Sequence, residues 1–181
     1  MSRTALRRVV HVASGALLLP ILSAPPTAAR VVIMAAAVVA VALDGARVRS
    51  PAVHDILSRA VPVFRPAERH RLSGGSWLLI GYAVAALLPA HAAVAGILVG
   101  ALADPVAASV GERFGGGRAK SWPGFAAALA MGWGGLSVLG LPVPVVIAAG
   151  AVGAACERWA VAVDDNLVVA PAVGATVALL T

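Results

Sequence analysis

Long runs of uncharged, apolar residues constrain the fold of this chain more than any other feature of its sequence. The core of a lipid bilayer is about 30 Å thick, so a helix needs roughly 20 apolar residues to cross it. Seven runs approach this length, at residues 9–23, 30–43, 77–90, 92–110, 122–139, 144–163 and 167–180. The first, second, third and last runs are short, which predicts tilted helices or a locally thinned bilayer there.

The composition favours helices over a transmembrane β-barrel. Hydrophobic residues make up 60% of the 181-residue chain, which contains 19 glycines but only 4% aromatic residues. Small residues let helices pack closely within a bilayer, whereas β-barrels carry girdles of aromatic residues at the membrane surfaces. We therefore predict an all-α integral membrane protein with about seven transmembrane helices, forming a single membrane-embedded domain over residues 1–181.

Proline and glycine mark the ends of the predicted helices. Such breaks occur at residues 24–26, at Pro89, at 115–117 and at 141–144. Two other glycines, Gly96 and Gly100, are four residues apart and could pack helices within one subunit or between the subunits of a homo-oligomer.

The positive residues are distributed unevenly among the connections between the predicted spans. They lie before the first span, between the second and third, and between the fourth and fifth, while connections 24–29, 89–91 and 140–144 contain none. By the positive-inside rule, the N-terminus, connections 45–75 and 112–121, and residues 164–166 are predicted to face the cytoplasm, in the cell (inner) membrane. The excess of 14 Lys and Arg over 8 Asp and Glu then belongs to cytoplasmic loops, so we expect no nucleic-acid partner.

The longest predicted connection, at 45–75, is long enough to have a function of its own. Prolines divide it, and residues 53–60 are predicted to form one short interfacial helix. Its end, from Arg65 to Gly75, is a basic patch beside a flexible entry into the third span. Such a patch could bind phosphate or anionic lipid.

Acidic residues near the predicted cytoplasmic face are candidates for a metal site, because charges at membrane depth are costly. Asp104 lies inside the fourth run, where a cation or a structural ion pair must neutralise it. Glu157 and Asp164 are seven residues apart and would project on one side of a continuous helix. Asp104, Glu157 and either Asp164 or Asp165 could therefore converge on one hard cation, Mg²⁺ or Mn²⁺ rather than Zn²⁺.

Two of these acidic features have simpler explanations. Asp164 and Asp165 could form an ordinary polar helix end. Glu112, which helical spacing puts near the face of Asp104, could be solvated at the end of its helix.

Basic residues in two segments could bind phosphate. In the turn at 115–121, backbone amides could approach a phosphate while Arg118 and Lys120 supply positive charge. At the N-terminus, Arg7, Arg8 and His11 have spacings of four and three, so they could face one groove or simply meet lipid headgroups. This segment also resembles a secretory signal peptide, but the rest of the chain is equally apolar, so we expect it to be retained.

Carboxylates suited to a divalent cation, bases suited to polyphosphate and an apolar scaffold together indicate phosphoryl or nucleotidyl transfer at a membrane surface. At this point the motifs resemble the CTP-dependent lipid-alcohol kinases, which include phytol kinase, dolichol kinase and a yeast-type diacylglycerol kinase. The similar segments are Arg7–Gly15, Asp104–Gly124 and Glu157–Leu167, and their order and spacing agree with the family across most of the chain. Lys-Ser-Trp-x-Gly and Asp-Asp-Asn-Leu are most similar to the phytol kinase branch.

The resemblance implies a membrane kinase that transfers the γ-phosphate of CTP, or of another nucleoside triphosphate, to a prenyl-type alcohol such as phytol, geranylgeraniol or a polyprenol. It implies catalytic roles for Asp104, Asp165 and Lys120, with either aspartate as the base. It implies Mg²⁺ on Asp104, Glu157, Asp164 and Asp165. The nucleotide-binding residues that it implies are Arg8, His11, Arg113, Gly115, Arg118, Lys120, Ser121 and Asn166.

Other functions stay open at this stage. A CTP-using diacylglycerol kinase or a membrane cytidylyltransferase would use a related site, and the second of these would release pyrophosphate and form a CDP-lipid. A small transporter or lipid-binding membrane protein would instead use Asp104 and Glu157 as ion-coupling or structural charges. Inverted repeats between the two halves would support transport, and the sequence contains none that we recognise.

Overall fold

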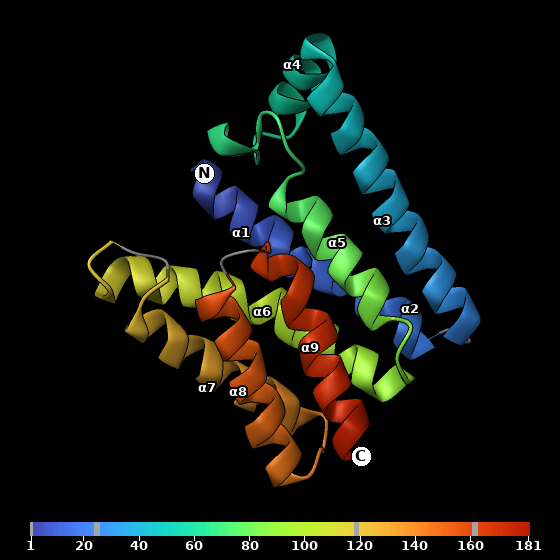
Figure 1. Cartoon of the computed structure of the whole chain (residues 1–181), viewed down its shortest axis with the longest axis vertical. Coiled ribbons are helices and arrows are strands. Elements are labelled where there is room, and N and C mark those ends of the chain that lie inside the picture. Colours follow the sequence, from blue (N-terminus) through green and yellow to red (C-terminus); the bar gives the residue numbers. More distant parts are fainter. Residues whose placement is uncertain (1, 24–25, 118–119, 161–162) are drawn as a thin grey trace.

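The computed structural model describes residues 2–23, 26–117, 120–160 and 163–181, and these residues form helices and connecting turns without β-strands (Figure 1). The predicted all-α fold is therefore confirmed for the described part of the chain. In order, the elements are α1 (Arg3–Ser14), η1 (Gly15–Leu17), α2 (Leu18–Ser23), α3 (Pro26–Arg49), α4 (Pro51–Ala60), η2 (Pro66–Glu68), α5 (Gly74–Ala85), α6 (Ala90–Phe114), α7 (Trp122–Val138), α8 (Val143–Trp159) and α9 (Asp165–Leu180).

Each of the seven apolar runs overlaps a helix in the described part of the chain, but the helices differ in length. Within the described residues, α3 and α6 are the two helices long and apolar enough to cross a membrane, with 24 and 25 residues. Helices α5 and α9 are apolar but have only 12 and 16 residues. Seven spans and a cytoplasmic N-terminus stay predictions.

Several helices begin or end at the predicted Pro and Gly breaks. Pro26 is the first residue of α3, and Pro89 and Pro142 are the N-caps of α6 and α8. Gly115 is the C-cap of α6. Because proline lacks an N–H and fixes φ, it suits the first turn of a helix, where that N–H would have no partner.

The predicted start of the connection at residue 45 is wrong, because the preceding helix is longer than expected. Helix α3 continues six residues past Leu43 to Arg49, because Asp44 and Arg47 pair one turn apart and neutralise each other within the helix. Ser50 then caps α4 by accepting a hydrogen bond from the Val53 amide. The predicted short helix at 53–60 is confirmed and begins two residues earlier.

Helix α9 lies between α5, α6 and α8 near the centre of the molecule (Figure 1). It approaches α6 so closely that a Cβ on Gly96 would collide with the Ala170 carbonyl, and one on Gly174 would meet the Ala92 carbonyl at 3.0 Å. Gly96 therefore packs helices within the chain. These contacts also make α6 and α9 antiparallel, so the C-terminal half of α6 lies beside the N-terminus of α9, and Asp104 comes near Asp165.

Candidate functional site

Three carboxylates from three helices converge at the N-terminal end of α9. Asp104 comes from α6, Glu157 from α8 and Asp165 from the first turn of α9. One oxygen from each lies within 4.8 Å of the others. Glu157 is only 2% exposed, and its Oε2 has no hydrogen-bond partner among the described residues. A buried carboxylate oxygen without a partner is costly, so this cluster calls for a positive ligand.

The cluster suits a hard divalent cation. Mg²⁺ binds oxygen at about 2.1 Å, so two of its ligands lie at most about 4.2 Å apart. Ligands at right angles around one ion lie about 3 Å apart, so the three side chains would move closer together to share it. Magnesium usually keeps several ligand positions for water and substrate phosphates, which matches a site with three protein oxygens.

Two basic side chains already contact the acidic cluster. His11 Nδ1 lies 3.3 Å from Asp104 Oδ2, and Lys120 Nζ lies 2.9 Å from Asp165 Oδ2. Lys120 also donates to the Ala160 carbonyl at 3.0 Å, which holds it at the turn after α8. Both residues were predicted to belong to the site, and they lie beside the predicted acidic partners.

The carboxylates and bases surround a cavity of about 200 Å³, here called the polar cavity. Its ionisable lining comprises four carboxylates, four Lys and Arg side chains and one histidine. Arg8 pairs with Glu112 at one side of it. Glu112 and Asp104 both line it because α6 is continuous and presents every fourth residue on one face. The lining residues are Thr4, Arg7, Arg8, His11, Arg65, Asp104, Pro105, Ala108, Glu112, Lys120, Glu157 and Asp165.

Asp164 does not join the acidic cluster, contrary to its predicted role as a metal ligand. Helix α8 ends at Trp159 and a new helix begins at Asp165, so the seven-residue helical spacing from Glu157 does not apply. Asp164 is the N-cap of α9 and accepts from the Asn166 backbone N–H at 3.2 Å and from its side-chain Nδ2 at 2.7 Å. Burial raises the pKa of its carboxyl, and these hydrogen bonds partly oppose that shift.

Three predicted nucleotide-binding residues lie outside the lining of the polar cavity. Arg113 is exposed, with its guanidinium over the Phe114 ring. Gly115 packs against Ser121 so closely that a Cβ would collide with the Ser121 side chain. The Ser121 hydroxyl accepts from the Gly124 amide and caps α7. Arg118, which was also predicted to bind nucleotide, lies outside the described residues.

Asn166 was predicted to bind the nucleotide, and it lines a second, mostly apolar cavity instead. It is 7% exposed. Its Nδ2 donates to Asp164, while its Oδ1 is buried without a hydrogen-bond partner in the described structure. This second cavity shares Arg7 and His11 with the polar cavity, so the two adjoin along α1.

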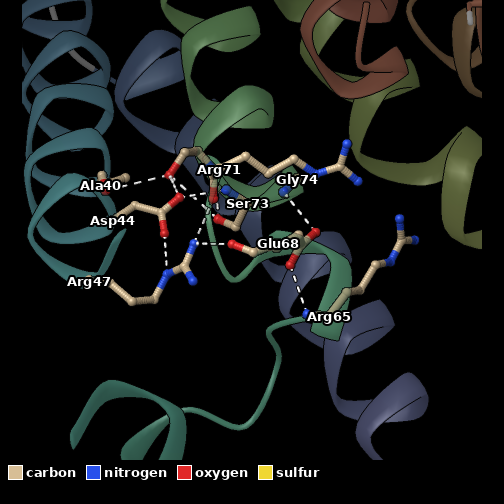
Figure 2. Close-up of polar contacts among 9 residues, drawn as sticks. Ala40, Asp44, Arg47, Arg65, Glu68, Arg71, Ser73 and Gly74 are labelled. Carbon is tan, nitrogen blue, oxygen red and sulfur yellow. Dashed lines mark hydrogen bonds and ion pairs between the residues drawn. The ribbon is translucent and has the colours of Figure 1, made fainter. Parts of the chain in front are cut away.

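Sequence reasoning missed a buried polar network that fixes the segment after α4 (Figure 2). Arg47 donates to Asp44 and to the carbonyl oxygens of Glu68 and Arg71. The Glu68 carboxylate accepts from the backbone amides of Arg65 and Gly74. The i, i+3 charge pair inside an apolar helix was the sequence signal for this network. Because the network holds the backbone of Arg65, it also positions a side chain that lines the polar cavity.

Comparisons with protein-family models, with curated proteins and with solved structures found no match to this chain.

Proposed function

We propose that this chain is a membrane-embedded kinase that transfers the terminal phosphate of a Mg²⁺-bound nucleoside triphosphate, CTP in the first instance, to the hydroxyl group of a lipid alcohol. The observation that carries the proposal is the convergence of Asp104, Glu157 and Asp165 beside Lys120 and three arginines in one cavity. Phosphoryl transfer depends mainly on positioning and charge neutralisation, so this set of residues suits the reaction without a strong nucleophile.

The acidic and basic residues have complementary tasks in this proposal. The three carboxylates hold the cation, which would neutralise negative charge on the phosphates. Lys120 and the guanidinium groups at the cavity bind phosphate oxygens as charged donors. Arg8 keeps its orientation through the ion pair with Glu112. His11 holds α1 against α6 and so aligns the arginines of α1 with the cavity.

The transfer step moves one phosphoryl group and one proton. The hydroxyl oxygen of the alcohol forms a bond to the γ-phosphorus, and the bond from this phosphorus to the β,γ-bridging oxygen breaks. The nucleoside diphosphate leaves with that electron pair. The hydroxyl proton passes to Asp104 or Asp165, the two aspartates that border the cavity.

The proposal places α3 and α6 across the cell membrane, with the polar cavity facing the cytoplasm. Both helices have the length and composition for this. The exposed apolar side chains of α3 suit contact with lipid tails; they are Val31, Val32, Met34, Val38, Val39 and Leu43. The arginine-rich N-terminus and the segment after α4 lie at the end of the molecule that holds the cavity, as the positive-inside rule requires of a cytoplasmic face.

The test uses purified protein in detergent with Mg²⁺, labelled CTP or ATP, and phytol, geranylgeraniol, dolichol or diacylglycerol. We expect a nucleoside diphosphate and a lipid monophosphate in equal amounts, and neither product after chelation of the metal. Release of pyrophosphate with a CDP-lipid would identify a cytidylyltransferase. Absence of any labelled lipid, together with unaltered nucleotide, would contradict an enzymatic role and favour a transporter or lipid-binding protein.

A further inference from the structure

The second cavity, here called the apolar chamber, lies between α1, α3, α4 and α5 and has a volume of about 290 Å³. Its apolar walls include Leu43, Leu57, Val63, Phe64, Leu78 and Leu79. Small-molecule sites are typically about 300–1,000 Å³, mainly apolar, with a few polar groups that orient the ligand. The chamber matches the lower end of this range, so it suits one narrow chain rather than a bulky headgroup.

The acidic groups of the chamber wall are occupied by the protein itself. Asp44 accepts from the Ser73 amide and the Ser76 hydroxyl, and the Glu68 carboxylate accepts from two backbone amides (Figure 2). These contacts fix the wall between α4 and α5. They leave Arg7, His11 and Asn166 as the polar groups at the side that meets the polar cavity.

Asn166 indicates what chemical group belongs at that side. Its Nδ2 donates one hydrogen bond to Asp164, and its buried Oδ1, which can only accept, has no donor in the described structure. An alcohol O–H can donate to this oxygen. An ionised fatty-acid carboxylate cannot, because it only accepts hydrogen bonds.

The chamber also opens toward a surface suited to lipid. Leu43 and Val61 both line it and are 52% and 44% exposed. Leu43 continues the exposed apolar face of α3. A chain held in the chamber can therefore extend out beside this helix, so its length is not limited by the chamber volume.

We propose that the apolar chamber binds the hydrocarbon chain of a single-chain primary alcohol, with its hydroxyl group between His11 and Asn166 and directed toward the polar cavity. This inference rests on the proposed function for the fate of that hydroxyl, but binding itself requires neither metal nor nucleotide. The two cavities adjoin at Arg7 and His11, so they then bring the acceptor oxygen and the phosphates together.

The test is crosslinking of the full-length protein in detergent with a photoreactive diazirine analogue of a 20-carbon primary alcohol, without nucleotide. The labelled peptides are identified by mass spectrometry. We expect labels on the chamber segments 57–64 and 78–79, competition by unlabelled geranylgeraniol, and little competition by a fatty acid of equal length or by diacylglycerol. Labelling spread over the lipid-exposed face of α3 alone would overturn the inference, and so would equal competition by the fatty acid.

Two substitutions are designed to fill the chamber, and a third serves as a matched control. We expect Leu79→Trp to reduce crosslinking at least about fivefold, because the larger ring overfills the cavity. Ile80→Trp changes the next residue of α5, which lines an outer apolar groove instead, and should leave crosslinking unchanged. Val63 lines the chamber from the segment between α4 and α5. Val63→Trp therefore provides the same test if Leu79→Trp does not fold. Unchanged labelling in folded Val63→Trp and Leu79→Trp would contradict the chamber assignment.

The outcomes separate this inference from the proposed kinase. Chamber labelling without phosphate transfer to any alcohol would support the binding site and contradict the kinase. Phosphate transfer with labels outside the chamber would support the kinase and contradict the binding site. In an active kinase, Leu79→Trp should raise the KM for the alcohol and leave the KM for the nucleotide unchanged.

Discussion

His11 contacts α6 through both of its ring nitrogens: Nδ1 lies 3.3 Å from the Asp104 carboxylate, and Nε2 lies 3.0 Å from the Gly100 carbonyl oxygen. A carbonyl oxygen only accepts hydrogen bonds, so Nε2 must carry a proton and donate it to Gly100. The imidazole ring therefore bridges the side chain of Asp104 and the backbone of α6. It joins α1 to the helix that supplies the central carboxylate of the site.

We expect Asp104→Asn to reduce turnover at least about 100-fold, because the amide keeps the shape of the side chain but removes the negative charge that binds the cation. The protein should still be folded and extractable. Asp55→Asn makes the same change at an exposed position of α4 and should leave activity unchanged. Turnover of the labelled nucleotide measures both variants, and normal activity of Asp104→Asn would remove this residue from the mechanism.

We expect Lys120→Ala to raise the nucleotide KM about tenfold, the loss typical of one charge-assisted phosphate contact. Arg113→Ala is the matched comparison. It removes an exposed cation close in sequence whose side chain lies on Phe114 rather than at the polar cavity. Steady-state kinetics with varied CTP should show an unchanged KM for this variant. Equal effects of the two substitutions would indicate a general electrostatic attraction instead of a specific contact.

We expect Arg47→Met to lower the free energy of unfolding by about 3–5 kcal/mol, because it leaves the buried Asp44 carboxylate without its charged partner. Arg49→Met removes an exposed arginine two residues later in the same helix and should change stability by less than about 0.5 kcal/mol. Denaturant titration in detergent measures both. Similar stabilities of the two variants would contradict the structural role of the network.

We expect Gly96→Ala to destabilise the protein by about 1–3 kcal/mol, because its methyl group would force α6 away from the Ala170 carbonyl. It should also weaken Mg²⁺-dependent nucleotide binding, since the same movement separates Asp104 from Asp165. Gly134→Ala adds a methyl group to α7 with no atom within 4 Å and should stabilise by about 0.5–1 kcal/mol through helix propensity. Unfolding and nucleotide titrations measure these effects, and a stabilising Gly96→Ala would show that the helices do not pack as described.

Local features of the sequence predicted the helical segments well. Apolar runs and Pro or Gly breaks act on neighbouring residues, so they indicated where helices form and where several of them start or stop. Helix α3 was the clearest boundary error. Its end was predicted at Leu43 because Asp44 and Arg47 look like loop charges in sequence, whereas in the fold they neutralise each other and contact the segment before α5.

The sequence by itself determined the helical class and the residue types available for chemistry, because both depend on local composition and spacing. Only the tertiary structure decided which charges meet. Asp164 and Asp165 are adjacent and chemically identical, yet one caps α9 and the other joins Asp104 and Glu157. The physical reason is that the start of α9 sets the direction of each side chain, and the close packing of α6 on α9 sets which of them reaches the cluster.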